Sequence, residues 1–389
     1  MVIDIRKYII PIYAFAFYTI GSYFSTVVIG EDKFQLLFLL LNVALTIIRF
    51  DYIKSKLTYQ TLTAIFILML SASLIVIGWV FNSNTNGFGF LLLYLNPVWM
   101  FSLFICKYDE PLPDLEFSIK LIIYLSIVFL SLEFISRFLF PSQLGTILDA
   151  NKVAVIGRSL DRGDSNFYIY KVISYLRFDS NGVGNITFLL AALCAYLSKY
   201  IDSSYKKFAL IFLCFSILTF SRAAIAVSFI IILMCLDRRT LIKVSFIAGI
   251  MFTAITYQYS NFFEIEGSGE TKFEVWDNFI IYLTNVDFFK LLIGNGLAAD
   301  IFDPSITYVV GKFGHNLIVF LIFYLGLVGA ILYFLIVGQI LSKNILSTTI
   351  FLLFIIMGFS YFRPFEPFIF LVFAIITKLN YMRKSNDTD

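Results

Sequence analysis

Apolar runs long enough to cross a bilayer recur along this chain, and they constrain its fold more than any other feature. A hydrocarbon core about 30 Å thick needs roughly 20 helical residues, and about twelve spans can be drawn. They lie at about residues 8–29, 33–49, 62–81, 87–106, 118–140, 183–198, 208–220, 223–236, 240–257, 314–338, 345–360 and 364–380. Because 60% of the 389 residues are hydrophobic and only 14% are charged, no ordinary soluble domain fits. The sequence therefore predicts an all-α integral membrane protein, a single polytopic domain over residues 1–389.

The basic residues predict which side of the membrane each link faces, because Lys and Arg in short links favour the cytoplasm. With the N-terminus inside, the short outer links carry only Lys33, Arg222 and Arg363. The inner side carries seventeen: Arg6, Lys7, Arg49, Lys54, Lys56, Lys107, Lys120, Lys199, Lys206, Lys207, Arg238, Arg239, Lys243, Lys343, Lys378, Arg383 and Lys384. Both termini are therefore predicted to be cytoplasmic, and the first run is expected to stay as a helix, because no signal-peptide cleavage site follows it.

Two long links, about residues 141–182 and 258–313, are predicted to face outward. They are the only segments large enough to build a site outside the bilayer. The cations that they carry include Arg158, Arg162, Lys171 and Arg177 on the first loop and Lys272, Lys290 and Lys312 on the second. These cations could bind an anion, although any one of them could be a solvated surface charge instead.

Arg222 interrupts the apolar stretch 208–235, and the pattern around it predicts a hairpin of two short helices with Phe220–Ala223 at its outer tip. An arginine at the membrane boundary is costly unless it pairs, snorkels or lines a wet cavity. Arg222 is therefore a candidate ligand-binding residue, with snorkelling at a helix end as the alternative.

Two further arginines lie near outer helix ends. Arg363 precedes Glu366 by three positions and could pair with it or bind a ligand, and Arg177 lies just before a span. Several arginines on one rim would suit a phosphate or diphosphate, because the guanidinium fork matches phosphate oxygens. The segment Gly294–Gly296 could also present backbone N–H groups to an anion, or simply form a tight turn.

His315 is the only histidine in the chain and lies in the triplet Gly314–Asn316, just before the apolar run Leu317–Val337. The usual pKa of histidine, about 6.5, suits proton transfer near neutral pH. The alternative is a polar residue that merely caps a helix end. Either use places His315 at the predicted outer face, beside the larger loop.

Other chemistries have little support in the sequence. It contains no H-E-x-x-H, G-x-S-x-G or Walker motif, and one histidine cannot build a multi-histidine metal site. The four cysteines lie in or beside apolar runs without metal-ligand spacing, so neither a disulfide nor zinc is expected: Cys106, Cys194, Cys214 and Cys235. We expect a reaction that needs no metal and no cofactor.

The chain resembles the superfamily of bacterial inner-membrane O-antigen polymerases and ligases, and within it the Wzy-type polymerases. The resemblance rests on five short segments, together with the span count and the large loop before the His-Asn helix: Gly314–Asn316, Tyr324–Gly329, Ser221–Arg222, Arg177 with Asn181, and Leu291–Leu297. Lys272 stands near a position where many relatives carry arginine, so it keeps the charge but not the fork.

The resemblance implies polymerisation of undecaprenyl-diphosphate-linked O-antigen repeat units at the periplasmic face, a step of lipopolysaccharide and polysaccharide biosynthesis. The donor diphosphate would be held by Arg222 first and by Arg177 or Arg363 next, with Arg158, Lys272 and Asn316 as further binding candidates. His315 would be the general base of an inverting transfer. The implied partners are the lipid-linked donor and acceptor, membrane lipids and a chain-length regulator protein, with no nucleic acid.

Three alternatives stay open. A ligase that transfers glycan to lipid A core shares the donor chemistry and differs in the acceptor. A flippase of the lipid-linked repeat unit would need charges spread through several helices of both halves. A structural membrane scaffold is the third alternative, against which the two cationic loops argue weakly.

Overall fold

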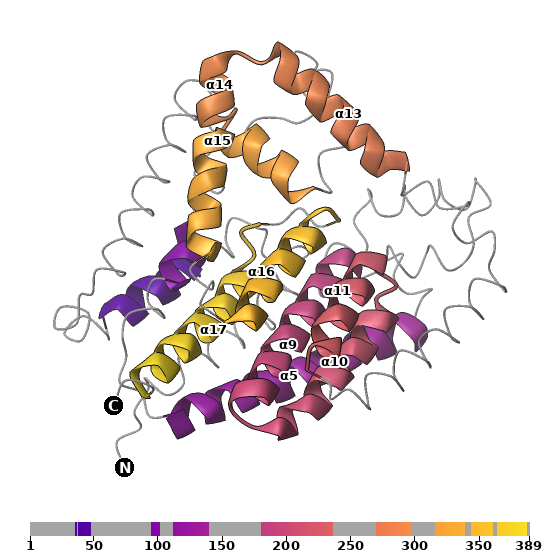
Figure 1. Cartoon of the computed structure of the whole chain (residues 1–389), viewed down its shortest axis with the longest axis vertical. Helices are drawn as coiled ribbons and strands as arrows, with labels where there is room; N and C mark the ends of the chain where they lie inside the picture. The colour runs from indigo at the N-terminus through magenta and orange to yellow at the C-terminus, as the bar shows by residue number, and fades with distance from the viewer. Residues whose placement is uncertain are drawn as a thin grey trace.

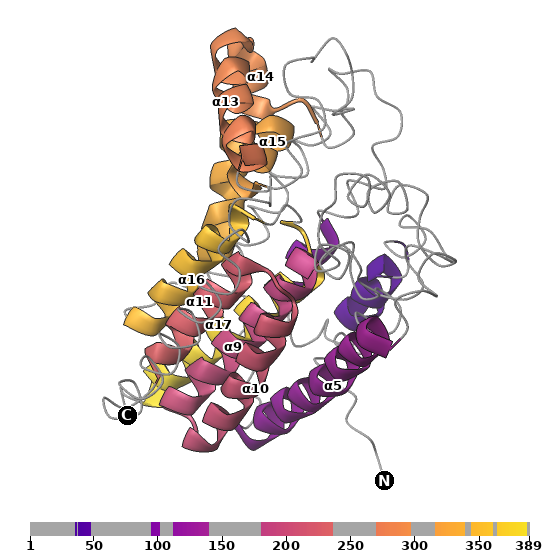
Figure 2. The same cartoon turned by 90° about the vertical axis from the view of Figure 1, so that its right-hand side faces the viewer.

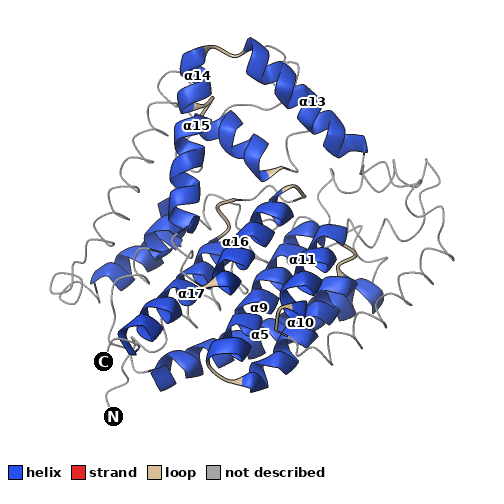
Figure 3. Cartoon of the chain, in the orientation of Figure 1, coloured by secondary structure: helices blue, strands red, loops and turns tan. Residues whose placement is uncertain are grey.

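The computed structural model describes residues 36, 38–47, 95–101, 112–139, 180–235, 270–296, 316–338, 344–360 and 364–386. Regular structure in these ranges is helical, without a strand (Figure 3). Three helices have the length and apolar composition of membrane spans: Leu115–Arg137, Asn181–Tyr200 and Leu317–Val337. The all-α fold class is thus confirmed for these ranges. The predicted spans at 8–29, 62–81 and 240–257 lie outside them, and the predicted total of about twelve stays a prediction.

The longer described helices form a bundle with a separate layer at one end. Their bounds are α5 Leu112–Leu139, α9 Ser180–Tyr200, the 3-10 turn η3 Ser203–Tyr205, α10 Lys206–Leu218, α11 Arg222–Leu233, α13 Glu270–Asn285, α14 Phe288–Ile293, α15 Leu317–Val337, α16 Ile345–Gly358 and α17 Pro367–Asn386. We call α9, α10, α11, α16 and α17 the bundle. Figures 1 and 2 show these five side by side, with α5 along one flank and α13 and α14 beyond one end.

Hydrogen bonds between helices fix their relative directions. Ser221 at the start of α11 bonds Asn181 at the start of α9, so these two helices run the same way. The Tyr196 hydroxyl donates to Asn380 near the end of α17, whereas the Tyr200 hydroxyl donates to Asn344 at the start of α16. Therefore α9, α11 and α17 begin at one end of the bundle, called here the Arg222 end, and α16 ends there.

The α9, α10 and α11 helices pack closely because small and hydroxyl side chains line their contacts. A Cβ added to Gly184 of α9 would lie 2.7 Å from the Cβ of Ala224 in α11, so glycine is needed for this approach. Three buried hydroxyls meet below it: Ser216 Oγ lies 2.9 Å from Thr187 Oγ1 and 2.9 Å from Ser228 Oγ. Interhelical bonds of this kind contribute about 0.6 kcal/mol each within membranes, so they align the helices more than they stabilise them.

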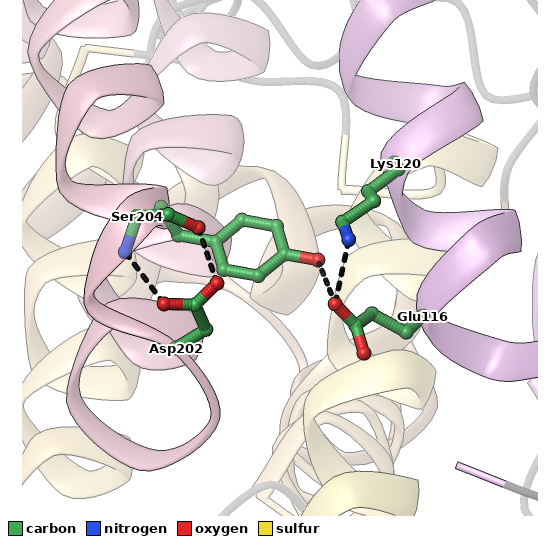
Figure 4. Close-up of polar contacts among 5 residues, drawn as sticks. Glu116, Lys120, Asp202 and Ser204 are labelled. Atoms are coloured by element: carbon green, nitrogen blue, oxygen red, sulfur yellow. Dashed lines mark hydrogen bonds and ion pairs between the residues drawn. The ribbon is translucent and has the colours of Figure 1, made fainter. Parts of the chain in front are cut away.

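Polar contacts join α5 to the opposite end, called here the Asp202 end (Figure 4). Glu116 accepts a hydrogen bond from the Tyr205 hydroxyl at 3.4 Å and pairs with Lys120 at 2.8 Å. Burial raises the pKa of Tyr205, so it stays a neutral donor. Asp202 caps η3, and hydrogen bonds from the hydroxyl and backbone N–H of Ser204 hold its pKa below the usual range. The chain therefore reverses between α9 and α10 in a turn whose Asp202 and Ser204 side chains are hydrogen-bonded to each other.

Three bundle helices are too short to cross a full hydrocarbon core. The α10, α11 and α16 helices have 13, 12 and 14 residues. At about 1.5 Å per residue they rise roughly 18–21 Å, against a core of about 30 Å. The α9 helix has 21 residues, or roughly 31 Å, and runs from the Arg222 end to just before Asp202, so the two ends lie about one core thickness apart.

The apolar run predicted as one span over 314–338 is broken in the structure. Gly326 has φ 67° and ψ −179°, which divides α15 into Leu317–Leu325 and Leu327–Val337. The first half runs across the bundle beyond its Arg222 end, as α13 does (Figure 1). The predicted outer loop 258–313 thus contains two helices, α13 and α14, and together with the first half of α15 they form a layer over the ends of the short helices.

Candidate functional site

The structure confirms the predicted hairpin of two short helices, α10 and α11. Arg222 lies at its tip as the first residue of α11. The turn is tight: Phe220 has a positive φ of 56°, and the Thr219 hydroxyl accepts from the backbone N–H of Ser221 at 3.2 Å. A non-glycine residue in the left-handed region is strained, typically by 1–3 kcal/mol. This strain lets α10 reverse into α11 within three residues, with Arg222 directly at the start of the returning helix.

Two helix N-termini meet at this tip. The Ser221 hydroxyl donates to Asn181 Oδ1 at 2.8 Å, which places the first turn of α9 beside the first turn of α11. Neither first turn contains an acidic residue. Because backbone N–H groups and the helix dipole make an N-terminus partially positive, two such ends and one guanidinium form an electropositive region.

A buried ion pair lies on α5 near the same end, and the sequence interpretation did not assign it to the site. Arg137 is 1% exposed and Glu133 2%. Nε and Nη2 of Arg137 each lie 2.8 Å from Oε1 of Glu133. Phe134 stacks on Phe215 of α10 at 5.6 Å, so Arg137, one turn further along α5, lies at the height of the α10–α11 turn. The signal in the sequence was an acid and a base four positions apart within an apolar run.

A buried amide on α9 has no partner among the described groups. Asn185 is 0% exposed, and neither its Oδ1 nor its Nδ2 makes a hydrogen bond. It lies one turn after Asn181 in the half of α9 nearest the Arg222 end. An unmade hydrogen bond at a buried polar group costs about 1–3 kcal/mol, so Asn185 is a second residue that the sequence interpretation missed.

Asn316 begins α15 and caps it. Its Oδ1 accepts hydrogen bonds from the backbone N–H groups of Ile318 and Val319, at 3.0 and 3.2 Å. A Cβ added to Gly358 at the end of α16 would lie 2.8 Å from Leu317 Cβ, so α15 starts against the Arg222 end. This capping role occupies the amide oxygen of a residue that the sequence predicts to bind substrate.

The Gly294–Gly296 segment contacts the break in α15. The backbone N–H of Asn295 donates to the Phe323 carbonyl at 2.9 Å, and that of Gly296 donates to the Tyr324 carbonyl at 3.0 Å. Nδ2 of Asn295 bonds both the Phe323 carbonyl and the Tyr282 hydroxyl. These donors satisfy carbonyls that a broken helix would leave bare. The two backbone N–H groups already have acceptors, which favours the turn interpretation of this segment over anion binding.

The remaining predicted site residues are not brought together by the described structure. Arg158, Arg177, His315 and Arg363 lie outside the described residues. Lys272 is in α13, where the backbone alone is described. Of the predicted set, Arg222 and Asn316 are thus described with their side chains, and both lie at the Arg222 end.

The described residues define an all-helical protein with candidate membrane spans and an electropositive helix end that could hold an anion. Comparison with family models, with curated proteins and with solved structures found no match to this chain.

Proposed function

We propose that this protein is a membrane glycosyltransferase that polymerises undecaprenyl-diphosphate-linked O-antigen repeat units at the periplasmic face of the bacterial inner membrane. The observation that carries the proposal is the convergence of Arg222 with the N-termini of α9 and α11 at a bundle end that α9 separates from the Asp202 end by about one core thickness. The diphosphate of such a lipid lies near a membrane boundary, with its polyprenyl chain in the hydrocarbon core.

The transfer would break the bond between the anomeric carbon of the growing chain and its diphosphate oxygen. A hydroxyl at the non-reducing end of a new lipid-linked repeat would attack this carbon from the opposite face and form the glycosidic bond with inversion. His315 would accept the hydroxyl proton, and undecaprenyl diphosphate would leave with its charge stabilised by Arg222. Arg177, Arg363, Arg158 and Lys272 are the further cations proposed for the donor, and Asn316 holds the helix that follows His315.

The test of this proposal measures polymer length by gel with purified lipid-diphosphate-linked repeats and the reconstituted protein. Loss of a charge-assisted contact costs about 1.5–3 kcal/mol, so Arg222→Ala should slow polymerisation roughly 10- to 100-fold. The polymerisation rate of Arg222→Lys, which keeps the charge without the guanidinium fork, should lie between the rates of the parent and of Arg222→Ala. His315→Ala should abolish chain growth. The control is Lys207→Ala, which removes an exposed cation at the Asp202 end and should leave the rate unchanged.

Long chains made at the parent rate by folded Arg222→Ala and His315→Ala proteins would show that the assignment is wrong. The ligase alternative is tested by offering lipid A core as a competing acceptor. Product attached to the core without polymer growth would replace the polymerase proposal with a ligase. Movement of intact repeats across vesicles without any new glycosidic bond would indicate a flippase.

A further inference from the structure

The outer face of α10 carries two lysines at its start and an apolar stripe after them. The lysines are Lys206 and Lys207, the first residues of the helix. The exposed residues that follow are Leu210, Ile211, Cys214 and Ile217, of which the three aliphatic side chains are 39%, 36% and 43% exposed. Because residues three, four and seven positions apart share one side of a helix, these side chains form a continuous surface with its charge at one end. We call this surface the α10 face.

The other side of α10 packs within the protein. Phe212 and Ser216 are buried, and Ser216 bonds Thr187 of α9. Phe215 stacks on Phe134 of α5, so α10 lies between α9 and α5 (Figure 2). The α10 face therefore looks outward from the bundle, beside α9, which is one of the candidate membrane spans.

The depth of the α10 face follows from α9. This helix has 21 residues, or roughly 31 Å, which is about the thickness of a hydrocarbon core. It ends at Tyr200, and α10 begins shortly afterwards at Lys206, so the two lysines lie at the boundary that α9 reaches. From Lys207 to Ile217 the helix rises about 15 Å, or roughly one leaflet of that core. The charged end thus lies at the level of lipid headgroups and the stripe at the level of acyl chains.

Lysine stems at this end lie against aromatic rings. Nζ of Lys207 lies 5.1 Å from the centre of the Phe208 ring, and Nζ of Lys199 lies 5.9 Å from that of Tyr200. Lys207 is exposed and forms no ion pair with any residue that the structure describes. A lysine placed in this way keeps its stem on an apolar surface and its ammonium in the polar layer. It loses less side-chain freedom when it binds an anion, which favours binding.

Two carboxylates lie at the same end and reduce its positive charge. Glu116 pairs with Lys120 at 2.8 Å, and Asp202 accepts hydrogen bonds from Ser204 (Figure 4). Asp202 also interacts electrostatically with Lys120 and Lys207. Against these two acids stand four lysines with described side chains on α5, α9 and α10: Lys120, Lys199, Lys206 and Lys207. A surplus of two positive charges therefore remains at the level of the headgroups.

We propose that the α10 face binds an anionic phospholipid, with the lipid phosphate between the ammonium groups of Lys206 and Lys207 and an acyl chain along Leu210, Ile211, Cys214 and Ile217. A free phosphate would use the lysines and leave the stripe bare, whereas a phospholipid covers both. A zwitterionic lipid carries its own cation beside the phosphate, so it gains less from the surplus of lysines.

The inference concerns the lipid around the protein and holds whichever reaction the protein catalyses. The two lysines lie about one core thickness from Arg222, so Lys207→Ala is still expected to polymerise at the parent rate.

The experiment uses Cys214, a native labelling site within the stripe. The other three cysteines, Cys106, Cys194 and Cys235, are replaced by alanine and the melting temperature of that protein is verified. The fluorophore bimane is attached to Cys214, and the full chain is reconstituted in phosphatidylcholine. A fixed small fraction of the lipid carries a nitroxide on its acyl chain, either as phosphatidylglycerol or as phosphatidylcholine. Quenching should show that phosphatidylglycerol occupies the stripe several-fold more than phosphatidylcholine does. Ile211→Cys, in a protein with Cys214→Ala, serves as a second site if labelling at position 214 disturbs the fold.

Three variants test which charges set the preference. Lys206→Ala/Lys207→Ala should make the two lipids quench equally. Asp202→Asn keeps a side chain that can cap η3 and removes an acid, so it should increase the preference for phosphatidylglycerol. Lys290→Ala removes an exposed lysine of α14 and is the matched control, which should leave the preference unchanged.

Three results would overturn the proposal. Equal quenching by both lipids in the parent would mean that the α10 face does not select an anionic headgroup. A preference that persists in Lys206→Ala/Lys207→Ala would assign it to other cations. Weak quenching by both lipids would mean that protein, and not lipid, covers the stripe.

Discussion

Single residues at the Arg222 end carry charge where the bilayer disfavours it, and the Glu133–Arg137 pair shows the consequence. Both side chains are buried, and the contacts of Arg137 include Oε1 of Glu133 at 2.8 Å. Removing one partner of such a pair leaves an uncompensated charge, at a cost of about 3–5 kcal/mol. Glu133→Gln should therefore lower the melting temperature in detergent markedly. The double variant Glu133→Leu/Arg137→Met, which removes both charges, should have a melting temperature near that of the parent. A Glu133→Gln protein with the melting temperature of the parent would contradict this account.

The sequence predicts some of these residues and not others, for physical reasons. Arg222 was recognisable because one arginine interrupts a long apolar run, and the hairpin around it follows from the same interruption. Glu133 and Arg137 are also visible as a pair four positions apart. Their burial depends on α10, which contacts α5 through Phe134 and Phe215, and a sequence does not show which face of a helix meets which neighbour. The unpaired amide of Asn185 is likewise a property of packing alone.

At the scale of elements, the break in α15 depends on two glycines in contact. A Cβ added to Gly326 would clash with the Leu292 carbonyl and lie 2.5 Å from the Gly294 backbone nitrogen, and its φ of 67° is unfavourable for other residues. Gly326→Ala should therefore detach α14 from α15 and raise amide hydrogen exchange over residues 275–296. Gly338→Ala, on the same helix but with an ordinary helical φ of −67°, is the matched control. Unchanged exchange in the Gly326 variant would mean that the contact is not needed.

Some helices can be predicted from the sequence and others cannot. The positions of α5, α9, α16 and α17 follow from apolar runs, because a helix in lipid must carry an apolar surface over its whole length. The break at Gly326 lies inside such a run. Asn295, which donates to the Phe323 carbonyl beside the break, is 31 residues before Gly326 in the sequence, so only the fold brings the two together. The α13 helix was expected within a loop, although Val275, Phe279 and Tyr282 repeat at helical spacing.

For the whole molecule, the three short helices of the bundle predict a dependence on bilayer thickness. Helices of 12 to 14 residues reach roughly 18–21 Å, so a thicker hydrocarbon core would bury the Thr219–Arg222 turn and its polar groups more deeply. Mismatch costs fractions of a kcal/mol per Å and accumulates over the helices concerned. The reconstituted protein should therefore melt several degrees lower in dierucoyl than in dipalmitoleoyl phosphatidylcholine. Arg222→Ala, which removes the most costly group from the turn, should reduce this difference between the two lipids. Equal melting temperatures in both bilayers would show that the short helices and the Thr219–Arg222 turn do not set the preferred bilayer thickness.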